Sequence, residues 1–377
     1  MRYLIFLAAL PLLALDPRLT NPVFLNGGAH ASWCGGEGQT GCPAHGYILY
    51  DVVNPATGCF QIHSMDSDGT HDTNLSGTTW GLANLSAKNQ GAAVYSPDSS
   101  YIMFTQQKST SNLACANQLA NPGYGVDHDV VIADAAFAST KVAVTTITSG
   151  LSQGNLRPRW TRDGAKIWYD HYFGLSDLGL RYATYTAGNP PTVGSNTRVN
   201  PTGSNNDSPE PADTYPGEAT TCNLIYTAIP ASIIAYPTIR QYNICTSTDT
   251  QIYGDGAHYV EFWSIRPTTQ DTVLFESTLM SRGNAGTDIY AAAVSGTAAM
   301  PLTCYDTAAC PSDYNVSLVN PSSGVIIATQ PTWSPDGNSI LLSLKLSTTS
   351  WQLWKYTWSP SKVSSTGSVS HTGQVTQ

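Results

Sequence analysis

The residues best suited to chemistry in this chain are two short runs in which histidine adjoins aspartate. They are Asp127-His128-Asp129 and Asp170-His171. Imidazole and carboxylate groups can hold a divalent metal ion together, or they can act as general acid and general base. The same residue types also cap strand ends by hydrogen bonding to turns. The sequence leaves both interpretations open: a metal or acid–base site made of His128, His171, Asp129 and Asp170, or polar strand ends.

Two other segments carry metal-binding residue types without a complete set of ligands. The turn from Asp66 to Gly69 resembles the start of a calcium loop, but no bidentate carboxylate follows where an EF-hand requires one. A hairpin turn explains this segment better. Cys34, Cys42 and His45 could ligate zinc, but a fourth ligand is missing. We therefore predict no resident metal and no cofactor.

The elements that must position these residues are recurring hairpins. Gln330 to Lys345 reads QPTWSPDGNSILLSLK, an aromatic residue and a polar corner followed by alternating apolar positions, which indicates two antiparallel strands. Related segments begin near Tyr95, Trp160 and Trp263, each with an aromatic residue before the corner. One such hairpin cannot bury its apolar face alone, so the repeat predicts a propeller or a solenoid.

These repeats resemble a known family. The corner Trp-Ser-Pro-Asp-Gly, a later strand such as Asp288-Ile289-Tyr290 and a following Leu302-Thr303 are similar to the TolB-like PD40 propeller repeat, and Ile62 to Ser76 resembles its third strand and DGT turn. The likeness covers most of residues 47–377 and is specific to the repeat class, not to one member. It implies an all-β fold, a single β-propeller of four-stranded antiparallel blades.

The spacing of the aromatic anchors predicts the number of blades. Residues 95, 160, 263 and 333 are separated by 65, 103 and 70 residues, and the widest gap fits two blades. Six blades follow, or seven if residues 188–213 hide a weak one. We expect Asn21 to Asn26 to be the innermost strand of the first blade and Gln374 to Gln377 the outermost strand of the last. The fourth blade is degenerate, with a first strand near Asp213.

The N-terminal segment has the features of an export signal. Met1 to Leu15 carries one positive charge, at Arg2, before an apolar run that Asp16-Pro17 ends. The run is too short to span a bilayer comfortably. We therefore predict a signal peptide over residues 1–20, a propeller over 21–377, and no stable membrane span once the signal is removed.

Cysteine usage supports the same compartment. Eight cysteines, an even number, in an exported chain favour disulfides. Cys34 with Cys42 and Cys304 with Cys310 would close small local loops. Cys222 with Cys245 would join two strands of one blade, which leaves Cys59 with Cys115. The predicted location is extracellular or periplasmic.

Charge and loop length indicate the kind of partner. The formal net charge is -9 with no basic cluster, so nucleic acid is excluded as a partner. In a propeller the loops after the second strands share one face, and the loop over residues 108–128 is long. We predict a protein- or glycan-binding scaffold whose site uses Tyr124, Asp127, His128, His171, Tyr172, Tyr236 and Arg282.

Two alternatives remain open from the sequence. One is a metal-dependent glycan lyase or hydrolase that acts through His128 and His171. The other is a structural subunit of an extracellular assembly, an oligomer or a filament, which low charge and abundant Ser and Thr would suit.

Overall fold

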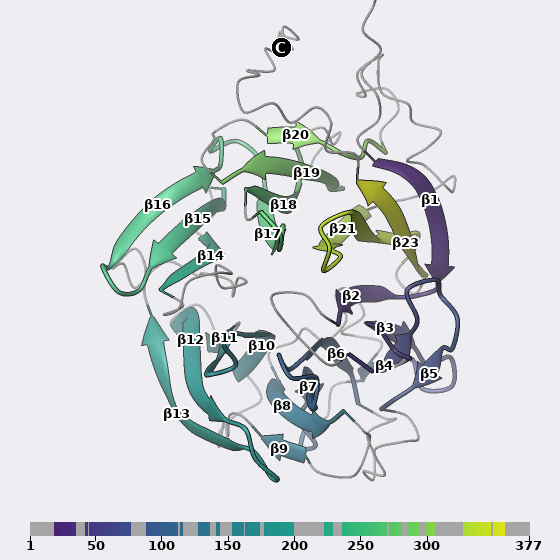
Figure 1. Ribbon diagram of the computed structural model, residues 1–377, viewed down its shortest axis with the longest axis vertical. Coiled ribbons are helices and arrows are strands. Elements are labelled where there is room, and N and C mark those ends of the chain that lie inside the picture. The colour runs from purple at the N-terminus through teal and green to yellow at the C-terminus, as the bar shows by residue number, and fades with distance from the viewer. Residues whose placement is uncertain are drawn as a thin grey trace, which may run out of the picture.

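Each predicted corner closes a hairpin between two long strands, and such strands stack side by side into blades. In the computed structural model six antiparallel sheets form a ring around a central axis (Figure 1). The described residues are 19–34, 42–43, 45–76, 88–111, 114–115, 127–135, 141–143, 153–161, 163–173, 177–199, 222–228, 236–269, 271–279, 286–294, 299–305, 327–347 and 350–358.

The blades follow one another in chain order, and each runs from the axis outward. Blade 1 contains β2 (Ala29–Trp33), β3 (Ile48–Val53), β4 (Phe60–Met65) and β5 (Thr73–Asn74), and blade 2 contains β6 (Gln90–Tyr95), β7 (Tyr101–Gln107), β8 (His128–Asp134) and β9 (Lys141–Ala143). Blade 3 contains β10 (Gln153–Trp160), β11 (Lys166–Phe173), β12 (Asp177–Thr186) and β13 (Thr192–Val199).

The second half of the ring repeats this plan, and one of its blades is described only in part. Blade 4 has three described strands, and the first strand predicted near Asp213 lies outside the described residues. The strands are β14 (Asn223–Ala228), β15 (Thr238–Asn243) and β16 (Thr248–Tyr253) in blade 4, β17 (Val260–Ile265), β18 (Thr272–Ser277), β19 (Asp288–Ala293) and β20 (Ala299–Pro301) in blade 5, and β21 (Ile327–Trp333), β22 (Ser339–Lys345) and β23 (Trp351–Trp358) in blade 6.

The six sheets confirm an all-β propeller of six blades. The segment considered for a seventh blade contributes β13, the outermost strand of blade 3, and its residues 200–213 lie outside the described part. The described residues contain no helix long and apolar enough to cross a membrane.

The predicted place of the first strand was wrong. β1 (Leu19–Asn26) is not the innermost strand of blade 1 but pairs antiparallel with β23 as the outermost strand of blade 6 (Figure 1). An innermost strand such as β6 is buried at all six residues, whereas β1 leaves Val23 and Phe24 42% and 49% exposed. β1 thus takes the place predicted for Gln374 to Gln377, which lie outside the described residues, and the N-terminal part of the chain closes the ring.

β1 also bears on the predicted domain boundary. Leu19 and Thr20, within the predicted signal peptide, belong to β1, and Leu19 is buried in the core of blade 6. Leu25 packs with Trp33 and Leu353 between blades 6 and 1. The described part of the propeller therefore includes Leu19 and Thr20.

The innermost strand of blade 1 is β2, which the sequence had placed in an insertion. Trp33 pairs with Ile48 as Trp160 pairs with Ile167 and Trp333 with Ile340, so Trp33 is the anchor of its blade. It escaped notice because residues 34–47 replace the short corner that normally follows an anchor.

Trp263, the predicted anchor of blade 5, stands two positions before the residue that takes the anchor position in the structure. The backbone N–H of Arg266 donates to the carbonyl of Thr272, the bond that Ser334 makes to Ser339 in blade 6. Ile265 therefore occupies the position of Trp333, and Trp263 does not. The longer corner of this blade hid the true register.

The corners themselves form as the sequence predicted. In blade 6 the Ser334 hydroxyl donates to Asp336 Oδ1 at 2.5 Å, and Asp336 Oδ1 accepts the N–H of Asn338 at 3.0 Å. Gly337 adopts a φ of 66° at the tight turn. The same bonds recur in blades 2 and 3, where Ser96 and Asp98, and then Thr161 and Asp163, take the places of Ser334 and Asp336.

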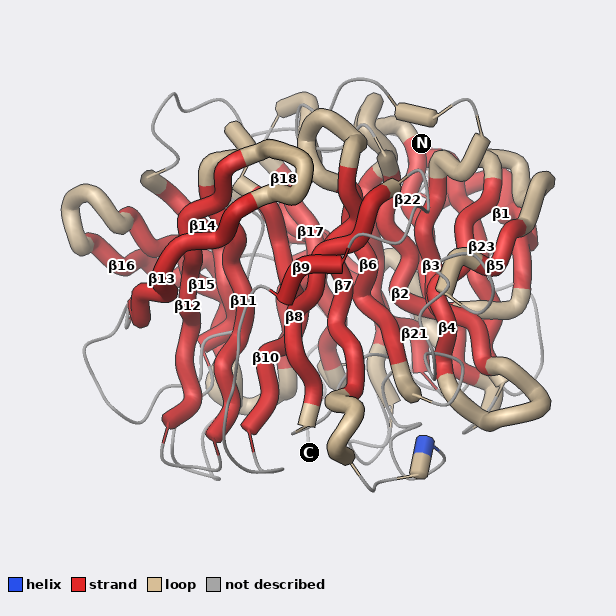
Figure 2. The backbone as a smooth tube through the Cα atoms, turned by 90° about the horizontal axis from the view of Figure 1, so that it is seen from below, coloured by secondary structure: helices blue, strands red, loops and turns tan. Residues whose placement is uncertain are grey.

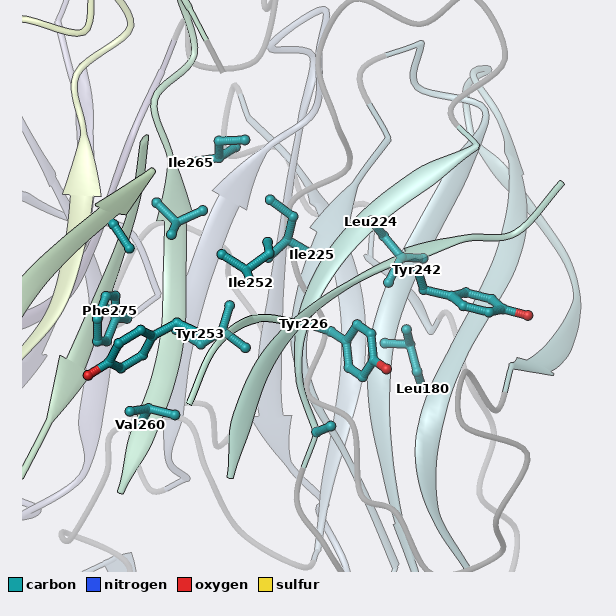
Figure 3. Packing of buried hydrophobic residues seen from close by; sticks show 14 of the residues in the cluster. Leu180, Leu224, Ile225, Tyr226, Tyr242, Ile252, Tyr253, Val260, Ile265 and Phe275 are labelled. Atoms are coloured by element: carbon teal, nitrogen blue, oxygen red, sulfur yellow. The ribbon is translucent and has the colours of Figure 1, made fainter. Parts of the chain in front are cut away.

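The core lies between neighbouring blades. The largest cluster joins blades 3, 4 and 5, and Figure 3 shows Leu224 and Ile225 of β14 on one side and Val260 and Phe275 of blade 5 on the other. Because each blade buries its faces against two neighbours, the ring is stable only when it is closed.

Candidate functional site

The second strands end, and the third strands begin, on one face of the ring, opposite the short Asp-Gly corners. Figure 2 shows the ring from the side, with connections at both faces of the strand layer. On this loop face, Cys59 at the start of β4 forms a disulfide with Cys115, which lies beyond β7. The bond ties blade 1 to the long connection of blade 2.

A buried hydrogen-bond network surrounds this disulfide. The N–H of Phe60 donates to Asn89 Oδ1 at 2.9 Å. The backbone N–H of Gln107 donates to the Asn89 carbonyl at 2.8 Å, and the backbone N–H of Asn89 donates to Gln107 Oε1 at 3.1 Å. Gln107 Nε2 then donates to Ser111 Oγ at 2.9 Å and to Asp127 Oδ2 at 3.3 Å. We call the buried residues Cys59, Asn89, Gln107, Ser111, Cys115 and Asp127 the loop root.

Asp127 and His128 are wholly buried at this loop root, not displayed on the surface. His128 Nδ1 lies 3.4 Å from Asp127 Oδ1. Burial raises the pKa of Asp127, but hydrogen bonds from His128, Ser111 and Gln107 outweigh it and lower the pKa to about 2. The carboxylate is therefore ionised and holds together both ends of the long connection.

A second polar network runs around the axis, and it was not predicted. In four blades the residue three positions before the anchor is His30, Ala92, Arg157 or Gln330, and each has a positive φ between 47° and 57°. Each lies at a register shift in the innermost strand. A β-bulge of this kind re-aims side chains but leaves no sequence signature.

Blades 1, 2 and 6 meet at His30. Its Nδ1 lies 2.9 Å from Asp51 Oδ2, its backbone N–H donates to Gln330 Oε1 at 2.8 Å, and Gln330 Nε2 contacts its Nε2. The N–H of Ala92 also donates to Asp51. Burial, followed by the positive charges of Arg157 and Arg159, holds the pKa of His30 well below its usual value, so the imidazole is neutral.

Blades 3 and 5 meet at Arg157. Its guanidinium forms an ion pair with Glu261 in β17, and Tyr259 donates to the same carboxylate. Burial raises the pKa of the nearby Asp170 well above its usual value, although Arg157 opposes the effect. Blades 5 and 6 are linked by a hydrogen bond that the Thr329 hydroxyl donates to the Glu276 carboxylate.

Of the remaining predicted residues, the structure describes the side chains of His171, Tyr236 and Asp129. His171 Nδ1 lies 2.9 Å from Asn155 Oδ1, and His171 and Tyr236 are both half-buried. Asp129 Oδ1 lies 3.9 Å from Lys108 Nζ. Tyr124, Arg282 and the side chain of Tyr172 lie outside the described residues.

The four candidate metal ligands do not converge in the described part of the chain. No three of His128, His171, Asp129 and Asp170 place ligand atoms within 4.8 Å of one another. One other set of described residues does so: His45, Asp66 and His71. The sequence shows these as unrelated, because His45 and Asp66 are 21 positions apart.

The sequence also contains one Gly-x-Ser-x-Gly motif. Gly150 to Gly154 reads Gly-Leu-Ser-Gln-Gly, which matches the pattern of a nucleophile elbow. An elbow leads from a strand into a helix, whereas Gln153 begins the strand β10. The match therefore lacks the structural setting of an elbow, and Ser152 lies outside the described residues.

The disulfide pattern is confirmed for three pairs. Cys34–Cys42, Cys59–Cys115 and Cys222–Cys245 are bonded, with Cα–Cα distances of 5.7, 4.9 and 5.4 Å. Cys304 is also disulfide-bonded, and its predicted partner Cys310 lies outside the described residues.

Comparison with known proteins gives similar structures only. No protein-family model matches the sequence, and neither does any curated protein. TolB from Acinetobacter baumannii is 12% identical, with 82% of this chain and 63% of that chain covered and a TM-score of 0.49. A puromycin-hydrolyzing peptidase from Mycobacterium tuberculosis is 11% identical (81% and 41% covered, TM-score 0.44), and prolyl oligopeptidase B from Galerina marginata is 7% identical (79% and 36% covered, TM-score 0.41). The chain spans less than two thirds of each of these proteins.

Proposed function

We propose that the protein is a non-catalytic binding scaffold that takes a protein or a glycan on its loop face. The observation that carries this proposal is the disulfide between Cys59 and Cys115. It joins loops of two neighbouring blades on the face where the connections are long. Holding a loop in its bound shape before binding lowers the entropy lost on association.

The loop root supports this role in a second way. Gln107 and Asp127 are completely buried, so the base of the long connection is fixed by hydrogen bonds as well as by the disulfide. Tyr236 and His171, half-buried on other blades, together with Tyr124, Tyr172 and Arg282, would supply the contacts. Tyrosine and arginine are the residue types that most often anchor interfaces.

The disulfides also indicate where the scaffold works. Disulfide bonds form and persist in oxidising compartments. We therefore place the mature protein outside the cell or in the periplasm, where the predicted signal segment would deliver it.

The enzyme alternative has weaker support. A lyase or hydrolase acting through His128 and His171 needs both imidazoles at the surface, but His128 is completely buried. The axial network is likewise made of internal pairs such as Arg157 with Glu261. In the scaffold interpretation, buried residues such as Asp127 and His128 fix the base of the long connection.

Blocking substitutions test the proposal. Purified protein would be screened on a glycan array and against proteins of its native compartment, and each ligand found would be measured again with Tyr236→Arg and with Ser100→Arg. Ser100 is exposed at a corner of the opposite face. We expect Tyr236→Arg to weaken capture at least tenfold, about 1.4 kcal/mol, and Ser100→Arg to leave it unchanged. The reverse pattern would place the site on the corner face.

A further inference from the structure

The corner of blade 1 differs from the short corners described in blades 2, 3, 5 and 6. Between β2 and β3 the chain runs through residues 34–47, and the disulfide Cys34–Cys42 ties this connection to the end of β2. Oxidation excludes both cysteines as zinc ligands. His45, near the end of this connection, lies against the turn between β4 and β5, which starts at Asp66.

Two imidazoles share one carboxylate oxygen there. His45 Nδ1 lies 2.9 Å and His71 Nδ1 2.8 Å from Asp66 Oδ2. The two rings are 4.2 Å apart between centroids. Asp66 Oδ1 accepts the backbone N–H of Gly46 at 2.9 Å, which fixes the carboxylate and points Oδ2 at both histidines.

The backbone that holds this arrangement is unusual. His71 has a φ of 55°, a left-handed conformation that a residue with a side chain adopts at a cost. Gly46 has a φ of 86°, and a Cβ there would meet Ser64 Oγ at 3.2 Å. Gly69 packs so closely on β1 that a Cβ would lie 2.9 Å from the Leu25 carbonyl oxygen. The turn that carries Asp66 and His71 is therefore packed closely against Gly46 on one side and against β1 on the other.

We propose that His45, Asp66 and His71 form a site for a divalent transition-metal ion that prefers imidazole, such as Zn²⁺, Ni²⁺ or Cu²⁺. A tetrahedral ion with bonds of about 2.0–2.1 Å holds its ligand atoms about 3.3 Å apart. Each histidine Nδ1 needs to separate from Asp66 Oδ2 by only about 0.5 Å to reach that spacing, and all three ligand atoms lie within 4.8 Å of one another. The side chains of His45 and His71 are 64% and 60% exposed, so they are free to make this movement.

The donor set selects the class of ion. Two nitrogens and one carboxylate oxygen suit zinc, nickel and copper, whereas calcium and magnesium require six or more oxygen ligands. The hydrogen bond from Gly46 to Asp66 Oδ1 is the kind of outer-shell contact that orients a metal-ligating carboxylate. Three protein ligands leave one position for water or for an incoming donor.

The groups around the cluster do not oppose a bound cation. Asp68 lies on the same turn, where its Oδ1 accepts from the Thr70 hydroxyl at 2.7 Å, and Thr70 Oγ1 is 3.2 Å from His71 Nδ1. Lys355 Nζ is directed to the carbonyl of Ser67 at 2.5 Å. Lys355 and Asp68 carry opposite formal charges, so together they add no net positive charge beside a dication bound at Asp66.

Titration with Zn²⁺ tests the proposal. The full chain without an affinity tag, freed of metal with a chelator, would be titrated calorimetrically with Zn²⁺ beside His45→Ala, His71→Ala and Asp66→Asn. His258→Ala is the matched control, because His258 forms a similar exposed pair with Asp255 at 2.6 Å but has no second imidazole. We expect one equivalent of Zn²⁺, affinity at least about tenfold weaker in the three site variants, and no change in His258→Ala.

Copper provides a readout that stability does not affect. In the wild-type protein, electron paramagnetic resonance of bound Cu²⁺ should show coupling to two imidazole nitrogens, and His45→Ala and His71→Ala should each reduce it to one. Circular dichroism would show that these variants, altered at exposed side chains, remain folded. Absence of Zn²⁺ binding, or equal binding by wild type, His45→Ala and His71→Ala, would overturn the proposal.

Discussion

Arg157 of blade 3 forms an ion pair with Glu261 of blade 5, and the pair links the innermost strands of two blades that are not consecutive in the chain. The side chains of Arg157 and Glu261 are only 12% and 6% exposed. This contact belongs to a network that joins the blades around the axis, together with the His30–Asp51 contact and its link to Gln330.

Breaking the axial pair should be costly. Arg157→Ala leaves the Glu261 carboxylate buried without its ion-pair partner, so we expect the free energy of unfolding to fall by about 3 kcal/mol. Arg157→Met with Glu261→Gln should lose less than the sum of the two single changes. Denaturant unfolding of wild type, Arg157→Ala, Arg157→Met, Glu261→Gln and the double variant measures these losses. If the losses in unfolding free energy of the two single variants add up to that of the double variant, Arg157 and Glu261 do not stabilise the protein through their ion pair.

Acid should weaken the loop root through Asp127. Its pKa in the folded protein is about 2, below the ordinary value, so the ionised form is stabilised by folding. The resulting stability is complete above about pH 5 and is lost as the pH falls toward 2, with about 1 kcal/mol lost by pH 3. Comparison of Asp127→Asn with wild type at pH 6 and pH 3 tests this: the variant should lose less stability on acidification. Equal losses would contradict the assignment.

Two corner substitutions should have opposite signs. Ser99 holds a φ of 58° where blade 6 has Gly337, so Ser99→Gly relieves backbone strain and should stabilise the protein by about 0.5–1 kcal/mol. Gly337→Ala should destabilise it by about 1–2 kcal/mol, because the new Cβ would meet Thr268 Oγ1 at 2.7 Å and Arg266 Nε at 3.0 Å. Thermal unfolding of both variants is the measurement. A destabilised Ser99→Gly would show that the contact of Ser99 Oγ with Cys34 Sγ outweighs the strain.

Ring closure should depend on β1. A chain that begins at Gly27 loses the burial of Leu19 and Leu25, the edge contact of Phe24 with Trp354 at 5.4 Å, and every hydrogen bond between β1 and β23. We expect it to lose more than about 3 kcal/mol relative to a chain that begins at Leu19, and to expose β23 as an aggregation-prone edge. Similar melting and monodispersity of the two chains would show that β1 is dispensable.

Features fixed by local chemistry could be predicted from the sequence. The corners could be predicted because their turns depend on neighbouring residues alone, such as Ser334, Asp336 and Gly337. The pairing of Cys59 with Cys115 followed once nearer partners had taken the other cysteines. Six blades followed from the spacing of the anchors.

The rest depended on contacts between residues distant in the sequence. The pairing of β1 with β23 joins residues more than 300 positions apart, and no local pattern distinguishes an outermost strand from an innermost one. The β-bulges that carry His30 and Arg157 have no sequence signature. His45 and Asp66 were each considered alone, because only the fold brings them together.

The central claim is that Cys59–Cys115 prepares the loop face for binding. The most direct test compares the affinity of a ligand found in the screen for wild type, Cys59→Ser/Cys115→Ser and Cys222→Ser/Cys245→Ser, at a temperature where all three are folded. Each bridge should contribute about 2–5 kcal/mol to stability, so both variants should melt earlier. We predict that only the Cys59→Ser/Cys115→Ser variant also binds at least tenfold more weakly, about 1.4 kcal/mol, because only there must the loop be ordered on binding. Lower stability with unchanged affinity in that variant would contradict the account.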